Sequence, residues 1–259
     1  MVQIPFTLEV FEYYLLILVR MSAFVYVAPF FSLRGIPHRV KIGFSMVVAI
    51  MLFFILPEST LDYGGEIGYA VVIIKEAITG VLIGFAASIC NYIILFAGRM
   101  IDTDIGLAMA TVFDPTTNQQ SSITGSIYNY FIMMLLILSD MHLFIFRSLV
   151  DCYQVIPVNK TVFDYDHLYE SMLTFFGDYM VIGFRIMLPV FVCIMLLNII
   201  LGIMAKVAPQ MNMFAVGIQL KIVVGFIAIL LTIGLLPTVA DYIFTEMRRM
   251  MVLFVEGMF

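Results

Sequence analysis

The sequence predicts an all-α, polytopic membrane protein with one membrane domain over residues 1–259. The first observation is composition: the chain is 63% hydrophobic and 12% charged, whereas soluble domains are roughly 45–50% apolar and about 25% charged. The second is distribution, because the mean hydropathy of +1.09 comes from apolar segments along the whole chain. No soluble stretch is long enough to bury its own core. The net charge of −5 argues against nucleic acid as a partner, because the chain has no stripe of lysine and arginine that could neutralise phosphate groups.

About six hydrophobic segments follow one another, compared with the ~20 apolar residues that a spanning helix needs. In order they are Tyr13–Leu33, Ile42–Pro57, Ile67–Gly98, Ile123–Leu149, Tyr179–Ala205 and Ile222–Phe244. The second is short, the third is long and interrupted by Lys75 and Glu76, and the fifth contains Pro189, which should kink it. We therefore expect tilted, broken or half-spanning helices.

Several charged residues fall inside or beside these apolar segments, where an unpaired charge costs at least ~2.5–3.5 kcal/mol. They are Arg20, Lys75, Glu76, Arg147, Asp178 and Arg185. A proton or ion relay is one interpretation, but pairing between helices and subunits is favoured because no chain of carboxylates follows one face. Adjacent residues point about 100° apart on a helix, so Lys75 and Glu76 should face different neighbours. We expect subunit contacts at Lys75, Glu76 and Arg185.

Small residues on the third segment form a Gly80-xxx-Gly84 pattern. Such a face lets two helix backbones approach closely, either within one chain or between subunits. Gly80 and Gly84 are therefore candidate subunit contacts, with packing inside the chain as the alternative.

Two polar, methionine-containing islands interrupt the apolar sequence: GLAMATVFDPTTNQQSS at Gly106–Ser122 and APQMNMFAVG at Ala208–Gly217. Irregular backbone near a membrane is tolerated only where protein or a water-filled cavity satisfies its polar groups. The first island therefore predicts a pore or gate. Its methionine and phenylalanine side chains could form a hydrophobic constriction that closes by excluding water.

No catalytic, metal or cofactor site is expected. Ser121 and Ser122 have no nearby histidine, and no phosphate-binding glycine loop is present, which argues against an enzyme. The cysteines and histidines are scattered without metal-ligand spacing: Cys90, Cys152, Cys193, His38, His142 and His167.

Three motifs closely resemble the FliR family of flagellar export proteins, and the resemblance runs essentially end to end. They are APFFSLRGIPHRVKIGFSM at 28–46, GRMIDTDIGLAMATVFDP at 98–115 and LGIMAKVAPQMNMFAVGIQLKIVVG at 201–225. The resemblance implies a non-catalytic, multi-pass subunit of the type III protein export gate, in the bacterial cytoplasmic membrane at the flagellar basal body. Implied partners are FliP-like and FliQ-like subunits, an FlhB-like switch protein, unfolded flagellar proteins in transit, and membrane lipid. The family also includes the injectisome counterpart of the same subunit.

By this resemblance, residues 106–122 look like the plug loop of the pore, within a FliP-like part over residues 1–178. Its residues would be Gly106, Met109, Phe113, Asp114, Pro115, Asn118 and Gln119. Met109 and Phe113 would seal the pore, Gly106 would let the loop pack closely, and Asp114-Pro115 would form a turn.

Residues 179–259 look like a FliQ-like helical hairpin with its turn at 206–221, near the FlhB-like partner. The expected contacts there are Pro209, Gln210, Met211, Asn212, Gly217 and Lys221.

Two alternatives to a gate stay open. A secondary transporter also has broken helices and intramembrane charges, although no inverted repeat and no acidic site framed by helix ends is apparent here. A purely structural scaffold would make no use of residues 106–122.

Overall fold

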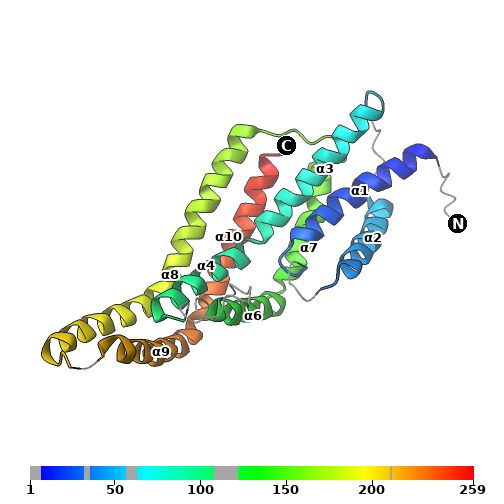
Figure 1. The fold of residues 1–259 in the computed structure, drawn as a ribbon. Helices are drawn as coiled ribbons and strands as arrows, with labels where there is room; N and C mark the ends of the chain where they lie inside the picture. The colour runs from blue at the N-terminus through cyan, green and yellow to red at the C-terminus, as the bar shows by residue number, and fades with distance from the viewer. Residues whose placement is uncertain (1–6, 32–35, 57–62, 108–121, 211) are drawn as a thin grey trace. The chain divides into compact units, whose positions relative to one another are not determined.

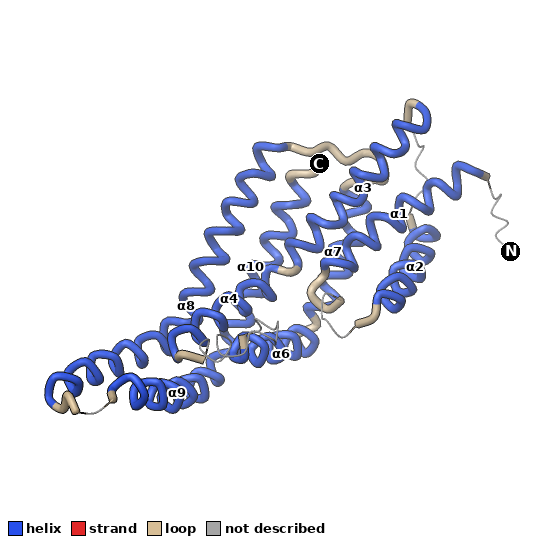
Figure 2. Tube along the Cα trace, in the orientation of Figure 1, coloured by secondary structure: helices blue, strands red, loops and turns tan. Residues whose placement is uncertain are grey.

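The computed structural model describes residues 7–31, 36–56, 63–107, 122–210 and 212–259. Over these ranges the chain forms helices joined by turns and loops, with no strand (Figures 1 and 2). The helices are α1 (Leu8–Val27), α2 (His38–Ile55), α3 (Gly65–Ala87), α4 (Ile89–Ile105), α6 (Ile123–Leu138), α7 (Met141–Val155), α8 (Tyr165–Val207), α9 (Met213–Thr232), the short 3₁₀ helix η1 (Ile233–Leu235) and α10 (Leu236–Glu256). The all-α class expected from the sequence is confirmed.

Five helical segments of the described chain are long and apolar enough to cross a membrane. They are Leu8–Val27, His38–Ile55, Gly65–Ala87, Tyr165–Val207 and Ala215–Glu256. A sixth arises if α6 and α7, which are bent by 70° at their junction, count as one broken span. The expected number of about six segments and the expectation of broken helices are both confirmed.

The helix breaks do not all fall at the positions that the sequence predicts. Helix α3 runs unbroken through Lys75 and Glu76, and the interruption comes at Ser88. The Ser88 hydroxyl donates to the carbonyl of Val27 at 2.6 Å and lies 3.0 Å from the carbonyl of Gly84. Serine competes with the helix in this way for backbone acceptors. The apolar character of both flanking segments hides this break in the sequence.

The described chain divides into two compact units. The first comprises Met1–Ile89, Ser139–Phe175 and Thr245–Phe259, and the second comprises Cys90–Leu138 and Phe176–Phe244. Helices α8 and α10 each contribute residues to both units. The expected boundary between residues 178 and 179 lies inside α8, where the helix continues without interruption.

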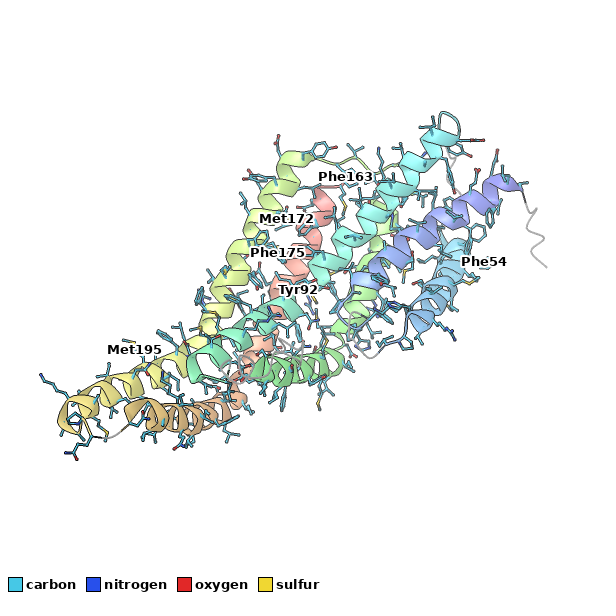
Figure 3. All side chains as sticks on the ribbon, viewed as in Figure 1. Phe54, Tyr92, Phe163, Met172, Phe175 and Met195 are labelled. Atoms are coloured by element: carbon cyan, nitrogen blue, oxygen red, sulfur yellow. The ribbon has the colours of Figure 1, made fainter. Side chains whose placement is uncertain are left out.

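In the first unit, α1 packs against both α2 and α3 (Figure 1). Gly80 and Gly84 permit the closest approach, because a Cβ atom at Gly80 would lie 2.2 Å from the carbonyl oxygen of Arg20. The ring of Phe85 on α3 also packs against that of Phe175 on α8, with ring centroids 4.6 Å apart and the planes tilted by 37° (Phe175 is labelled in Figure 3). The small-residue pattern on α3 therefore serves packing within the chain.

In the second unit, the end of α8 and the start of α9 form a helical hairpin (Figure 1). A Cβ atom at Gly217 of α9 would lie 3.4 Å from Leu201 of α8, which is ordinary contact distance. Asn212 caps α9 by accepting the N–H of Ala215 at 3.4 Å.

Large apolar side chains remain exposed on several helices of both units. Phe54 on α2 is 62% exposed and Met195 on α8 is 51% exposed (both labelled in Figure 3). Exposed apolar surface on this scale is typical of a protein that contacts lipid or other membrane subunits.

Candidate functional site

The first polar island begins where α4 ends, at a left-handed glycine. Gly106 has φ +92°, and its N–H contacts the carbonyls of Asp102 at 3.1 Å and Thr103 at 3.2 Å. Left-handed glycines commonly end helices because other residues pay a steric penalty there. Among the described residues, no atom lies within 4 Å of a Cβ atom added at Gly106, so the requirement for glycine that the structure shows is the backbone angle. Whether Gly106 lets the loop pack closely stays a prediction, because the rest of the loop lies outside the described residues.

The island ends at Ser122, which caps α6. Its hydroxyl accepts the backbone N–H of Gly125 at 2.8 Å, and its carbonyl accepts the hydroxyl of Ser126 at 2.7 Å. Serine is favoured at this position because it satisfies an N–H that has no acceptor within the helix. Both boundaries of the island are thus fixed by local hydrogen bonding.

The two boundaries are held together by contacts between α4 and α6. The Asp102 carboxylate, on a residue only 5% exposed, accepts the N–H of Thr124 at 3.3 and 3.4 Å to its two oxygens. At Gly98, an added Cβ atom would lie 2.1 Å from the Cα of Gly125, so the two backbones touch. We call Gly98, Asp102, Ser122, Thr124 and Gly125 the neck. The neck closes the intervening segment into a loop with a fixed base.

Most residues expected to form the plug lie outside the described part of the chain. These are Met109, Phe113, Asp114, Pro115, Asn118 and Gln119. Gly106 is described, and it stands at the start of the loop.

Asp104, two residues before the loop, lies close enough to Lys221 of α9 for the two charges to interact. Burial raises the pKa of the Asp104 carboxyl above its ordinary value, and Lys221 opposes this by lowering it. One Asp104 oxygen, Oδ2, is buried without a hydrogen-bond partner among the described residues. Lys221, expected as an orienting and contact residue, thus faces a carboxylate of its own chain.

The second polar centre is a buried ion pair in the first unit. The Arg20 Nε of α1 donates to Glu76 Oε2 of α3 at 2.5 Å, and both side chains are fully buried. Arg20 Nη1 also donates to the carbonyl of Ile156 at 2.8 Å, and Glu76 Oε1 accepts the N–H of Asn159 at 3.0 Å. The pair therefore links α1 and α3 to the connection between α7 and α8.

This arrangement changes the interpretation of three expected subunit contacts. Glu76 is satisfied inside the chain by Arg20, and Gly80 and Gly84 are buried against α1. Their side of α3 faces the same chain, which is the internal-packing alternative. Glu76, Gly80 and Gly84 therefore contact α1 of their own chain.

The remaining expected contact residues have different degrees of exposure. Lys75 is half-buried, and its Nζ donates to the carbonyl of Thr161 at 3.4 Å. Arg185 is exposed, with its guanidinium carbon 6.0 Å from the Tyr242 ring centre. Pro209, Gln210 and Asn212 are exposed at the hairpin turn, Gly217 is buried, and Met211 lies outside the described residues. The expected turn at 206–221 is shorter in the structure, because α8 extends to Val207 and α9 starts at Met213.

The described residues offer no cluster of three or more histidine, cysteine or acidic side chains that could hold a metal ion. Cys90 and Cys152 are buried, and Cys193 is exposed; all three are free thiols.

Sequence reasoning missed the neck, although its residues were visible. Asp102 stands one turn before a glycine that ends an amphipathic segment, and Ser122 directly precedes an apolar run, which is a typical cap position. The partner of Asp102 lies 22 positions further on, and no local pattern specifies such a pairing.

Comparison with known proteins places the chain in a family. A profile described as bacterial export proteins, family 1, matches residues 11–247. The chain is 29% identical over 245 residues to the flagellar biosynthetic protein FliR of Bacillus subtilis (strain 168), covering 92% of each protein. It is 28% identical over 228 residues to FliR of Pectobacterium carotovorum subsp. carotovorum, covering 88% of this chain and 87% of the relative.

A relative from another secretion system is also similar. The secretion system apparatus protein SsaT of Salmonella typhimurium (strain LT2) is 27% identical over 193 residues, covering 72% of this chain and 74% of the relative. The resemblance to the FliR family seen in the sequence motifs is confirmed by these matches, and the chain belongs to the bacterial export proteins of family 1.

Proposed function

We propose that this chain is a structural, non-catalytic subunit of the flagellar type III protein export gate in the bacterial cytoplasmic membrane. Its relatives include several flagellar biosynthetic FliR proteins, and its described helices include five that could cross a membrane. Its partners would be FliP-like and FliQ-like subunits and an FlhB-like switch protein, with unfolded flagellar proteins as cargo.

The observation that carries this proposal is the neck. Hydrogen bonds from Asp102 and Ser122, together with contact between Gly98 and Gly125, hold both ends of one loop at a fixed base. A pore plug needs such a base, because a loop with free ends cannot return reproducibly to one closed position. Residues 106–122 would close the pore, with Met109 and Phe113 as its sealing side chains.

The proposed subunit contacts are Lys75, Arg185 and Lys221, together with Pro209, Gln210, Met211, Asn212 and Gly217 around the hairpin turn. The exposure of Arg185, Pro209, Gln210 and Asn212 supports this part of the proposal. A division into a FliP-like part over 1–178 and a FliQ-like part over 179–259 remains part of the proposal.

The injectisome version of the same gate is a second candidate. It is favoured by the similarity to SsaT over 72% of this chain. The flagellar version has support from more than one relative and over a larger share of the chain.

The first test is assembly. The chain is co-expressed with the FliP-like and FliQ-like proteins of its own genome, purified in mild detergent and weighed by native mass spectrometry. A defined complex containing this chain is expected. A monomer or homo-oligomer that binds neither partner would contradict the proposal and favour a transporter.

The second test is closure. Residues 108–121 are replaced by a short Gly/Ser linker, and ion leakage is measured in cells that express the complete complex. Leakage should rise sharply. Unchanged leakage in an assembled complex would overturn the plug assignment while leaving membership of the gate intact.

A further inference from the structure

A cavity of about 380 Å³ opens between α7 and α10 in the first unit, with α3 as its floor. Ile83 of α3, Cys152 of α7 and Met251 of α10 line its deepest part, and each of them is buried. Val155 and Val252 line its outer walls and are 44% and 53% exposed. The cavity is therefore an open apolar groove and not an internal void.

Two carboxylates stand in this apolar lining, Asp151 on α7 and Glu256 on α10. Both are exposed, and neither has a hydrogen-bond or ion-pair partner within the described ranges. Of the cations on α10, Arg249 pairs with Glu246, and Arg248 donates to Met141 Sδ and lies 5.0 Å from the ring centre of Phe144, which also lines the groove. Arg147 stands one turn before Asp151 on α7 but forms no ion pair with it. The groove thus combines apolar walls with two carboxylates that form no ion pair within the described ranges.

We propose that this groove receives a lysine or arginine side chain from an apolar helix of a partner membrane protein. Carboxylates within or beside membrane segments are costly unless they are paired, so a complementary cation is favoured. Lysine and arginine fit such a groove because their aliphatic stems pack on apolar walls while the charged end reaches a carboxylate. The apolar positions on the flanking helix would fill the rest of the groove.

This inference rests on the proposal that the chain works in a complex with other membrane proteins. A cationic lipid headgroup has the same charge and is the competing occupant. Cross-linking distinguishes the two occupants. A partner helix would be joined to the groove at one position of its sequence, whereas a lipid would give an adduct that contains no partner peptide.

The experiment places a photo-cross-linking amino acid at Val252, inside the groove, in the full chain co-expressed with its FliP-like and FliQ-like partners. The matched control carries the same amino acid at Val162, which is 65% exposed but does not line the groove. We expect the Val252 probe to join one partner polypeptide at a segment that contains lysine or arginine, as mapped by peptide mass spectrometry. The control should not join that segment.

Neutralising the groove provides the second readout. The double substitution Asp151→Asn/Glu256→Gln should lower the adduct yield roughly fivefold, the upper end for a partly exposed charge pair. Asp166→Asn/Glu170→Gln, two exposed acids of α8 outside the groove, should leave the yield unchanged. Because all four residues are exposed, the variants should fold and assemble.

Three results would overturn the inference: an adduct with lipid alone, no adduct at Val252, or an adduct yield that is unchanged by the Asp151 and Glu256 substitutions. Native mass spectrometry of each sample separates this failure from failure of the proposed function. If the complex assembles and the Val252 probe stays inert, the groove assignment falls and the gate assignment stands. If no complex forms, the result contradicts the proposed function itself.

Discussion

The carboxylate of Asp102 accepts the backbone N–H of Thr124, and these two residues stand at opposite ends of the loop over residues 106–122. The bond satisfies an N–H in the first turn of α6, and it places negative charge at the positive end of that helix. A single side chain on α4 therefore fixes where the loop ends. The base of the loop is therefore held by contacts between α4 and α6.

Replacing Asp102 with alanine should weaken the neck. The Thr124 N–H would lose a buried acceptor, which costs ~1–3 kcal/mol when no other acceptor replaces it. In the assembled gate, we expect a lower melting temperature of the complex and increased ion leakage, measured by membrane conductance. Thr103→Ala is the control, because Thr103 is an exposed neighbour whose hydroxyl donates to the carbonyl of Arg99 in its own helix. Equal leakage in both variants would show that Asp102 does not hold the loop.

Replacing Gly98 with alanine should damage the same neck by a different route. The new Cβ atom would lie 2.1 Å from the Cα of Gly125, and backbone cannot move aside as a flexible side chain can. Overpacking of this kind costs ~1–3 kcal/mol or more. We expect poor assembly, scored by native mass spectrometry.

Gly202→Ala is the matched control for Gly98→Ala. Gly202 lies in α8, and no atom of the described residues lies within 4 Å of a Cβ atom added there. Alanine there should stabilise the helix by ~0.5–1 kcal/mol, because glycine loses more backbone freedom on folding. If both variants behave alike, the contact between Gly98 and Gly125 does not matter for assembly.

The sequence was sufficient for the class of fold. Hydrophobic segments of spanning length appear directly in the residues, and the structure has helices at each of the six expected segments. Their ends were less predictable. The break at Ser88 depends on a hydroxyl that reaches Val27 of another helix, and the start of α8 at Tyr165 lies in a polar stretch that hydropathy alone excludes from a membrane segment.

Pairing between distant residues was not predictable from the sequence. Arg20 and Glu76 are 56 positions apart, and both were correctly seen as charges in need of a partner. Nothing in the local pattern indicates that these two residues pair with each other, and a contact of Glu76 with another subunit is equally consistent with the sequence. Asp102 was passed over for the same reason, because its acceptor role depends on how α4 and α6 cross.

The Arg20–Glu76 pair should be more sensitive to loss of one partner than to loss of both. Glu76→Gln would leave the Arg20 charge fully buried without compensation, which costs ~3–5 kcal/mol. The double substitution Arg20→Met/Glu76→Leu removes both charges and should recover much of that loss. Thermal unfolding of the purified protein in detergent checks both variants.

A pair with one exposed partner supplies the control for Arg20–Glu76. Arg249 and Glu246 are joined at 3.1 Å, and although the Glu246 side chain is only 10% exposed, the Arg249 side chain is 57% exposed and its charge is solvated. Arg249→Met should therefore change the free energy of unfolding by less than ~1 kcal/mol. A double Arg20/Glu76 variant no more stable than Glu76→Gln would show that hydrogen bonds to Ile156 and Asn159, and not the buried charge, dominate.

Asp104, which lies beside the loop, should make the stability of the folded protein depend on pH. Burial raises the pKa of its carboxyl above 3.8, so the folded protein holds the proton more tightly than the unfolded chain does. The contribution of Asp104 to the free energy of unfolding is therefore fully present below the ordinary pKa of the carboxyl. It is lost as the pH rises through the raised pKa of the folded protein. Asp104→Asn, which cannot ionise, should therefore raise the melting temperature of the complex at pH 7 and give little or no gain near pH 3.

Lys221 provides the internal check on this prediction, because its charge lowers the pKa of Asp104 and so opposes the effect of burial. Lys221→Met should raise that pKa further and enlarge the loss of stability between acidic and neutral pH. In the Asp104→Asn background, Lys221→Met should no longer alter the pH dependence, since the carboxylate it acts on is gone. A pH profile that responds to Lys221→Met equally in both backgrounds would mean that Lys221 acts through a group other than Asp104.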